Sequence, residues 1–187
     1  MGLTVEQKNS LLELAKSSVK NGLNHSGPIE VNVDSYDETL KRLAATFVTL
    51  TICGQLRGCI GLLEASRPMV EDVAANAFAA AFEDPRFPKV TEEEWLSLKF
   101  HISILTEPKR IKVSTEDDLL DILRPSVDGL ILEEGRCRAT FLPSVWESLP
   151  RPTDFVKELK SKAGWSEDYW SPKIQVQVYQ VEEFGDE

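Results

Sequence analysis

Residues 45–63 read ATFVTLTICGQLRGCIGLL, and this stretch decides what kind of fold the rest of the chain has to complete. Two apolar runs, residues 45–52 and residues 56–63, flank the short segment Cys53-Gly54-Gln55. The first run is dominated by β-branched residues, which favour strands, and a short segment containing glycine suits the turn of a hairpin. We therefore predict two antiparallel strands joined by a tight turn.

The segments around this hairpin mix helical and strand-like patterns without a strict order. A helix is predicted over residues 4–21, and an alanine-rich helix follows the hairpin, starting near Pro68 and ending at Asp84-Pro85. Farther along we expect a strand at 98–106, a helix at 114–123, a second hairpin at 127–142, a helix at 154–163 and a last strand at 173–183. Because hairpins are mixed with isolated helices, the sequence predicts an α+β fold with mostly antiparallel pairing.

Length and charge restrict the class of protein. The chain has 187 residues, enough for one domain, and its 21 basic and 31 acidic residues give a formal charge of −10. That charge repels phosphate backbones and anionic lipid, so neither nucleic acid nor a membrane is an expected partner. Three cysteines without a CxxC pair are typical of the reducing cytoplasm. The first twenty residues (1–20) lack the apolar centre of a signal peptide, which agrees with a cytoplasmic location.

The run Arg57-Gly58-Cys59-Ile60-Gly61 is unusual for a strand, because its glycines pack nothing and cost backbone entropy. In a regular ladder, Arg57 and Cys59 would point to one face of the sheet. A guanidinium beside a thiol favours the thiolate, which attacks electrophiles, and it can also hold a carboxylate or phosphate. Arg57 and Cys59 are therefore candidate catalytic residues, and all five residues of the run are candidate ligand-binding residues. The alternative is that Cys59 is a small buried residue and the glycines only admit a neighbouring helix.

The same alternation places His101 on a polar face that also includes Thr49 and Cys59. A nucleophile–base pair of Cys59 and His101 would fit this face. The simpler alternative is the solvated face of a half-covered sheet, and a bulge at Gly58 would reverse the alternation. The chain has only two histidines, so we expect no histidine-rich metal site.

The loop Asp84-Pro85-Arg86-Phe87-Pro88 contains two prolines that fix its backbone. Asp84 and Arg86 carry opposite charges on this rigid segment, and we regard both as candidate ligand-binding residues. The alternative is a local ion pair at the end of the preceding helix.

Several separated motifs occur in an order that resembles the AMMECR domain family: LRGCIG, then DPRF, SILTEP, DGLILEEGRCRATFLPSVW and FVKELKSKAGW. The resemblance covers residues 47–179. It implies a single domain over residues 1–187, made of two unequal antiparallel lobes flanked by helices. The larger lobe would hold both termini, and the LRGCIG motif would lie near the cleft between the lobes. No cofactor is implied. Some relatives are fused to, or encoded beside, Memo-type proteins and radical S-adenosylmethionine enzymes, which makes such proteins candidate partners.

Three hypotheses for the function follow from these observations. The leading one is an accessory domain that binds a small anionic metabolite, or a segment of a partner protein, in a cleft lined by residues 57–61. The second is a cysteine-dependent enzyme in which Cys59 is the nucleophile and Arg57 stabilises negative charge. The third is a structural adaptor in which the motif is purely architectural. The sequence leaves open whether the protein is an enzyme.

Overall fold

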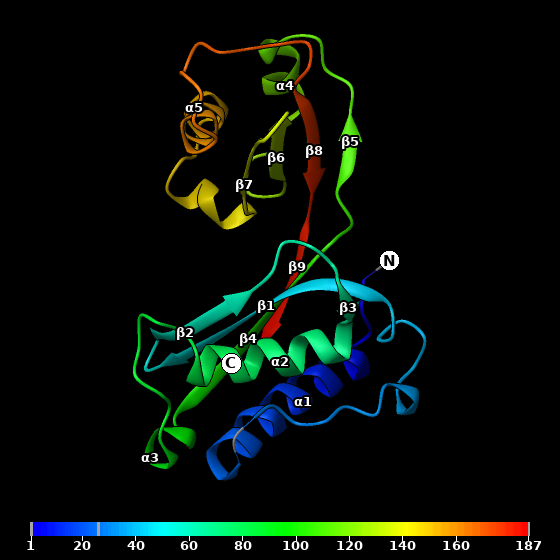
Figure 1. The fold of residues 1–187 in the computed structure, drawn as a ribbon, viewed down its shortest axis with the longest axis vertical. Helices are drawn as coiled ribbons and strands as arrows, with labels where there is room; N and C mark the ends of the chain where they lie inside the picture. Colours follow the sequence, from blue (N-terminus) through cyan, green and yellow to red (C-terminus); the bar gives the residue numbers. More distant parts are fainter. Residues whose placement is uncertain (1, 26, 187) are drawn as a thin grey trace. The chain divides into compact units, whose positions relative to one another are not determined.

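The computed structural model describes residues 2–25 and 27–186 (Figure 1). The chain divides into two compact units, one formed by Met1–Leu105 and Glu182–Glu187 and the other by Thr106–Val181. Each unit contains an antiparallel sheet together with helices, so the predicted α+β class is confirmed. None of the described helices is long and apolar enough to cross a membrane.

The first unit is built on a five-stranded sheet with the order β2-β1-β4-β9, and β3 pairs with β1 beside this path. Its elements are α1 (Val5–Asn24), η1 (Val33–Ser35), β1 (Leu43–Ile52), β2 (Gln55–Gly61), β3 (Arg67–Pro68), α2 (Met69–Phe82), α3 (Glu92–Trp95), β4 (Leu98–Leu105) and β9 (Val181–Gly185). Strands β1 and β2 form the predicted hairpin. Its turn residues Cys53 and Gly54 have φ values of 51° and 76°, which match the two-residue turn that suits the twist of paired strands.

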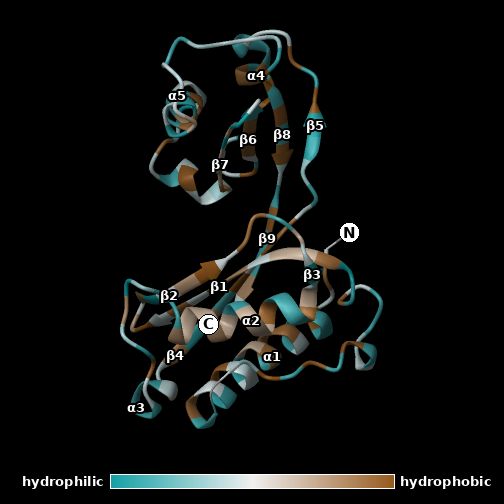
Figure 2. Cartoon of the chain, in the orientation of Figure 1, coloured by the Kyte–Doolittle hydropathy of each residue, from teal (hydrophilic) through white to brown (hydrophobic). Residues whose placement is uncertain are grey.

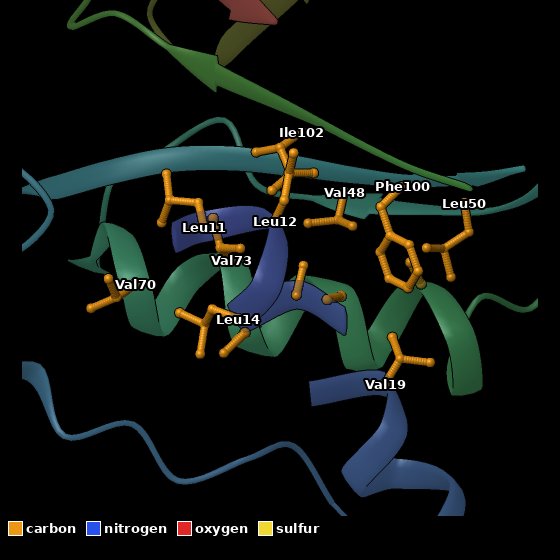
Figure 3. Packing of buried hydrophobic residues seen from close by; sticks show 14 of the residues in the cluster. Leu11, Leu12, Leu14, Val19, Val48, Leu50, Val70, Val73, Phe100 and Ile102 are labelled. Atoms are coloured by element: carbon orange, nitrogen blue, oxygen red, sulfur yellow. The ribbon is translucent and has the colours of Figure 1, made fainter. Parts of the chain in front are cut away.

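The helices α1 and α2 provide the apolar layer against one face of this sheet. Val48 and Leu50 of β1, and Phe100 and Ile102 of β4, point toward these helices (Figure 3). Hydrophilic and hydrophobic residues are interleaved along α1, as Figure 2 shows, and the hydrophobic ones supply its buried side. Because side chains alternate along a strand, Thr49 lies on the opposite face of the sheet.

Local signals set the ends of these helices. Thr4 caps α1 and forms a capping box with Gln7, so the predicted start of this helix is confirmed. Pro68 precedes α2, and the helix ends at Phe82, just before the Asp84-Pro85 loop. The two ends of α2 therefore lie close to where the sequence predicts them.

The second unit is built on a four-stranded sheet with the order β5-β8-β6-β7. Its elements are β5 (Lys109–Ile111), α4 (Glu116–Ile122), β6 (Gly129–Glu134), β7 (Cys137–Phe141), η2 (Pro143–Glu147), α5 (Pro152–Lys162) and β8 (Gln175–Tyr179). At its core the ring of Trp146 stacks on that of Phe155, with 3.8 Å between the ring centroids.

The prediction of one continuous strand over residues 173–183 is wrong. The segment forms two strands, β8 and β9, which belong to different sheets. The apolar alternation of Ile174, Val176 and Val178 reaches a polar residue at Gln180, where the first strand has ended. The main-chain N–H of Gln180 instead donates a hydrogen bond to the hydroxyl of Thr106, at 2.8 Å.

Candidate functional site

Strand β2 carries a bulge at Arg57. Leu50 of β1 pairs with Gly58, and the next residue of β1 pairs with Leu56, so Arg57 is an additional residue in the ladder. Gly58 lies where α2 approaches the strand, because a Cβ at this position would overlap the carbonyl oxygen of Ala80. The close approach of α2 therefore requires glycine at the bulge.

The bulge separates the guanidinium from the thiol. Cys59 pairs with Thr49 and shares its face of the sheet, which is opposite to the face of Leu50 and Gly58. Arg57 precedes Gly58 in the bulge, and its side chain is buried and bonded to Glu94 of α3. The prediction that Arg57 and Cys59 share one face is therefore wrong, because it assumed an uninterrupted ladder.

Arg57 forms a bidentate ion pair with Glu94 of α3. Its Nε and Nη2 donate to the two carboxylate oxygens at 2.7 and 2.9 Å, and the arginine is only 9% exposed. The hydrogen bonds from Arg57 lower the pKa of Glu94 below its ordinary value, although desolvation opposes the shift. The third nitrogen, Nη1, is buried without a hydrogen-bond partner. Arg57 therefore ties α3 to the edge strand, and two of its three nitrogens are already occupied.

Cys59 is partly buried and is held by three hydrogen bonds. The hydroxyl of Thr49, directly opposite on β1, donates to Sγ at 3.2 Å. The main-chain N–H of Cys59 donates to Oδ2 of Asp84 at 2.9 Å, and its carbonyl oxygen accepts from Nη2 of Arg86 at 3.2 Å. β2 is an edge strand, so the side chains of Asp84 and Arg86 bond the main-chain groups of Cys59 that a neighbouring strand would otherwise pair.

Asp84 and Arg86 form the clamp that grips this peptide. The Asp84 carboxylate is 4% exposed and accepts from Nε and Nη2 of Arg86 at 2.9 and 2.7 Å. These hydrogen bonds hold the pKa of Asp84 far below its usual range and raise the pKa of Arg86. The side chain of Arg86 nevertheless remains 54% exposed. The structure thus contains the local ion pair of the alternative interpretation and also connects that pair to Cys59.

His101 lies on the same face as the thiol but does not reach it. It pairs with Thr49 from the β4 side, whereas Cys59 pairs with Thr49 from the β2 side. Two strand spacings amount to about 10 Å between the backbones of Cys59 and His101. The imidazole instead lies 3.8 Å from a carboxylate oxygen of Glu183. The predicted Cys59–His101 pair is therefore wrong, since Thr49 stands between its members.

The remaining residues of the motif have packing roles in the structure. Ile60 pairs with Val48 and packs against the core. A Cβ at Gly61 would overlap the carbonyl oxygen of Thr46 and the ring of Phe47, so this glycine permits a close approach.

Other candidate chemistry is sparse in the described ranges 2–25 and 27–186. No group of three or more His, Cys, Asp or Glu side chains there could hold a metal ion. All three cysteines are free thiols, and Cys53 and Cys137 are exposed.

Sequence reasoning missed two partners in this region. Glu94 is the partner of Arg57 in the structure, and no motif in the sequence connects these two residues. Thr49 was placed on the correct face, but its bond to the thiol was not foreseen. A buried arginine needs a carboxylate partner, but the sequence shows neither that Arg57 is buried nor which of the acids at 92–94 meets it.

The fold and the site together define an α+β protein in which an LRGCIG edge strand is clamped by a DPRF loop. The chain belongs to the AMMECR1 family, whose model matches residues 12–184, so the resemblance noted from the sequence is confirmed. A protein of Methanothermobacter thermautotrophicus is 30% identical over 99% of this chain and 97% of its own length. Protein MJ0810 of Methanocaldococcus jannaschii is 34% identical over 96% of this chain and 89% of its own length.

A solved structure supports the same architecture. The crystal structure of protein PH0010 from Pyrococcus horikoshii matches with a TM-score of 0.79 and 31% identity. The match covers 95% of this chain and 90% of that one. The agreement extends over nearly the whole of both chains.

Proposed function

We propose that this protein binds a small anionic metabolite beside Cys59 and that Arg86 is the cation that holds the anion. The observation that carries the proposal is the exposure of Arg86: its side chain is 54% exposed although two of its nitrogens are bonded to Asp84. A guanidinium that is fixed and still open to solvent suits a carboxylate or a phosphate.

The clamp also sets where the anion would lie. Arg86 donates to the carbonyl oxygen of Cys59, and Asp84 accepts from its N–H, so the cation is attached to the peptide that bears the thiol. Arg57 is a poorer choice for this role because it is buried, whereas Arg86, which is bonded to its own carboxylate through the same two nitrogens, is open to solvent. The anion-binding role predicted for Arg57 therefore passes to Arg86 in this proposal.

The expected ligand is small and binds through more than its charge. An exposed charge pair contributes only about 0–1 kcal/mol, so further contacts on the face of Thr49 and Cys59 must supply the remaining affinity. As an accessory domain, the protein would present such a ligand to a partner enzyme. A Memo-type or radical S-adenosylmethionine enzyme is the partner class that the family resemblance implies.

Isothermal titration with glyoxylate, pyruvate and inorganic phosphate tests the proposal. We expect at least one of these anions to bind, and Arg86→Gln to weaken its binding about twofold to fivefold, as the loss of an exposed charge pair worth up to about 1 kcal/mol predicts. Arg124→Gln is the matched control, because Arg124 also donates through Nε and Nη2 to a buried aspartate, Asp128, and is 58% exposed. The Arg124→Gln variant should bind the anion with the affinity of the wild type.

Two results would contradict the proposal. One is that none of the three anions binds, which is what a purely structural adaptor predicts. The other is that an anion binds equally well to the wild type and to Arg86→Gln. Triglycine, which carries a free carboxylate, provides a further arm: if it alone binds through Arg86, the ligand is a peptide segment of a partner rather than a metabolite.

A further inference from the structure

We propose that a cavity at the C-terminal ends of α1 and α2 is a second binding site, which takes a small carboxylic acid whose apolar part is about the size of one aromatic ring. The cavity lies within the first unit, has a volume of about 330 Å³ and is separate from Arg86. Its apolar lining comes from Leu23, Phe78, Phe82 and Val90, and its basic lining from Lys89 and His25.

Two aromatic rings form one wall of the cavity, and a glycine makes room for them. The ring centroids of Phe78 and Phe82 are 5.0 Å apart, and the ring planes are inclined by 43°. A Cβ at Gly22 of α1 would overlap atoms of both rings. Glycine is a poor helix former, but at this position it allows both rings to lie against α1. Gly22 therefore sets the position of the aromatic wall.

The size of the cavity suits a ligand with one ring and a short acidic tail. Ligand-binding cavities measure about 300–1,000 Å³, and an apolar cavity of about 150 Å³ already accepts benzene. The rings of Phe78 and Phe82 are only partly buried, so a third ring can pack against their faces and edges. A ligand with several rings would extend out of the cavity into solvent.

Lys89 supplies the charge that selects a carboxylate. Its side chain is exposed, and no acid within residues 2–25 and 27–186 pairs with it. None of the described residues that line the cavity is acidic, although the whole chain has a formal charge of −10. An ammonium group beside an apolar wall can hold a carboxylate while the ring of the same ligand packs against that wall.

The two basic residues are attached to well-held backbone. The main-chain N–H of Val90 donates to the carbonyl oxygen of Ala81 at 2.9 Å, which joins the segment of Lys89 to the end of α2. The main-chain N–H of His25 donates to the carbonyl oxygen of Asn21 at 2.7 Å and caps α1. The lining is therefore largely arranged before a ligand arrives, which lowers the entropy cost of binding.

The helix ends favour the opposite charge, so the choice of an anion needs a direct comparison. The last carbonyl groups of α1 and α2 carry partial negative charge, and neither helix has a basic residue in its last turn. That partial charge is screened and acts over about one turn, whereas Lys89 brings a full charge into the lining itself. We therefore expect an acid to bind more tightly than an amine of similar shape.

Nuclear magnetic resonance titration of the full nitrogen-15-labelled chain with phenylacetate tests the site. We expect saturable shifts in the amide signals of residues 22–25, with a Kd of about 1 mM or tighter. Lys89→Gln should weaken phenylacetate binding about twofold to fivefold and leave the binding of phenylacetamide, its neutral amide, unchanged. Lys173→Gln is the control, because this exposed lysine lies in the second unit. Gly22→Ala should weaken both ligands, since its methyl group displaces the rings.

Each arm of the titration has an outcome that contradicts the proposal. Without saturable shifts at residues 22–25 there is no site. An equal loss of acid and amide binding in Lys89→Gln overturns the role of Lys89, and unchanged affinities in Gly22→Ala overturn the aromatic wall. If phenethylamine binds more tightly than phenylacetate, the helix ends decide and the ligand is not an anion. Tighter binding of the peptide Gly-Gly-Phe would assign the cavity to the C-terminus of a partner chain rather than to a small molecule.

This inference and the proposed function fail separately. Arg86→Gln should leave the phenylacetate shifts at residues 22–25 unchanged, whatever it does to the binding of glyoxylate, pyruvate or phosphate. Shifts at residues 22–25 that disappear in Arg86→Gln would mean that phenylacetate binds at Arg86, and the second site would be overturned. Loss of the second site leaves the anion site at Arg86 standing.

Discussion

The substitution Arg57→Met tests whether Arg57 stabilises the fold or binds the ligand. In the structure this side chain is 11% exposed, its partner Glu94 is 31% exposed, and the two hydrogen bonds between them measure 2.7 and 2.9 Å. Breaking a fully buried pair costs about 3–5 kcal/mol, whereas an exposed pair is worth about 0–1 kcal/mol. Because Glu94 keeps partial access to water, we expect Arg57→Met to lower the free energy of unfolding by about 2–3 kcal/mol.

Urea denaturation followed by circular dichroism measures this loss. With a slope of about 2 kcal/mol per molar urea, the midpoint should fall by about 1 M or slightly more. The double variant Arg57→Met, Glu94→Met should recover much of the loss, because an apolar pair leaves no unpaired charge. Arg151→Met is the control: Arg151 is 76% exposed, and breaking its ion pair with Asp154 should change the stability by less than about 1 kcal/mol.

Anion affinity completes this experiment. Arg57→Met should bind the same anions as the wild type, since Arg86 is untouched. The reasoning is refuted if Arg57→Met is as stable as the wild type and has lost anion binding, because Arg57 would then serve the ligand and not the fold.

Three further outcomes follow from the structure. Arg57 lowers the pKa of Glu94, so the stability that this carboxylate contributes is present above the ordinary glutamate pKa of 4.5 and is lost as pH falls through the lower pKa of the folded protein. The difference in unfolding free energy between the wild type and Glu94→Gln should therefore shrink from pH 5 to pH 3 in urea titrations. A difference that stays constant over this range would contradict the prediction. Gly58→Ala should cost about 1–3 kcal/mol or more in the same assay, since its methyl group meets the carbonyl of Ala80, and a neutral effect would mean that α2 moves away freely. Lys160 is fully buried and bonded to Glu116 at 2.6 Å. Lys160→Met keeps the apolar stem of the side chain, so in thermal unfolding it should be more stable than Lys160→Ala by about 1–2 kcal/mol. Equal stability of the two variants would contradict this prediction.

Much of the fold can be predicted because its signals are local. The turn at Cys53 and Gly54 needs positive φ, and a glycine between two strand-like runs indicates it. Thr4 caps α1 through its own side chain and a residue three positions later. The division between β8 and β9 is harder to predict, because each strand joins a sheet formed by distant parts of the chain.

The site is less predictable because it depends on packing between distant segments. The glycines of the motif suggest that another element approaches the strand, but the sequence does not show that this element is α2 at Ala80, or that Arg57 is an additional residue in the ladder. The same is true of the acid that meets Arg57, since three successive glutamates precede Trp95 and only the tertiary arrangement selects Glu94. Cys59, Asp84 and Arg86 stand out in the sequence as candidate site residues, whereas the contacts among them do not.

A high-resolution crystal structure of the protein soaked with glyoxylate tests most directly whether Arg86 and Cys59 form one site. We predict the carboxylate within hydrogen-bonding distance of the Arg86 guanidinium, beside the peptide of Cys59. A carboxylate bound at Arg57 in place of Glu94, or glyoxylate bound only away from strand β2, would contradict the account.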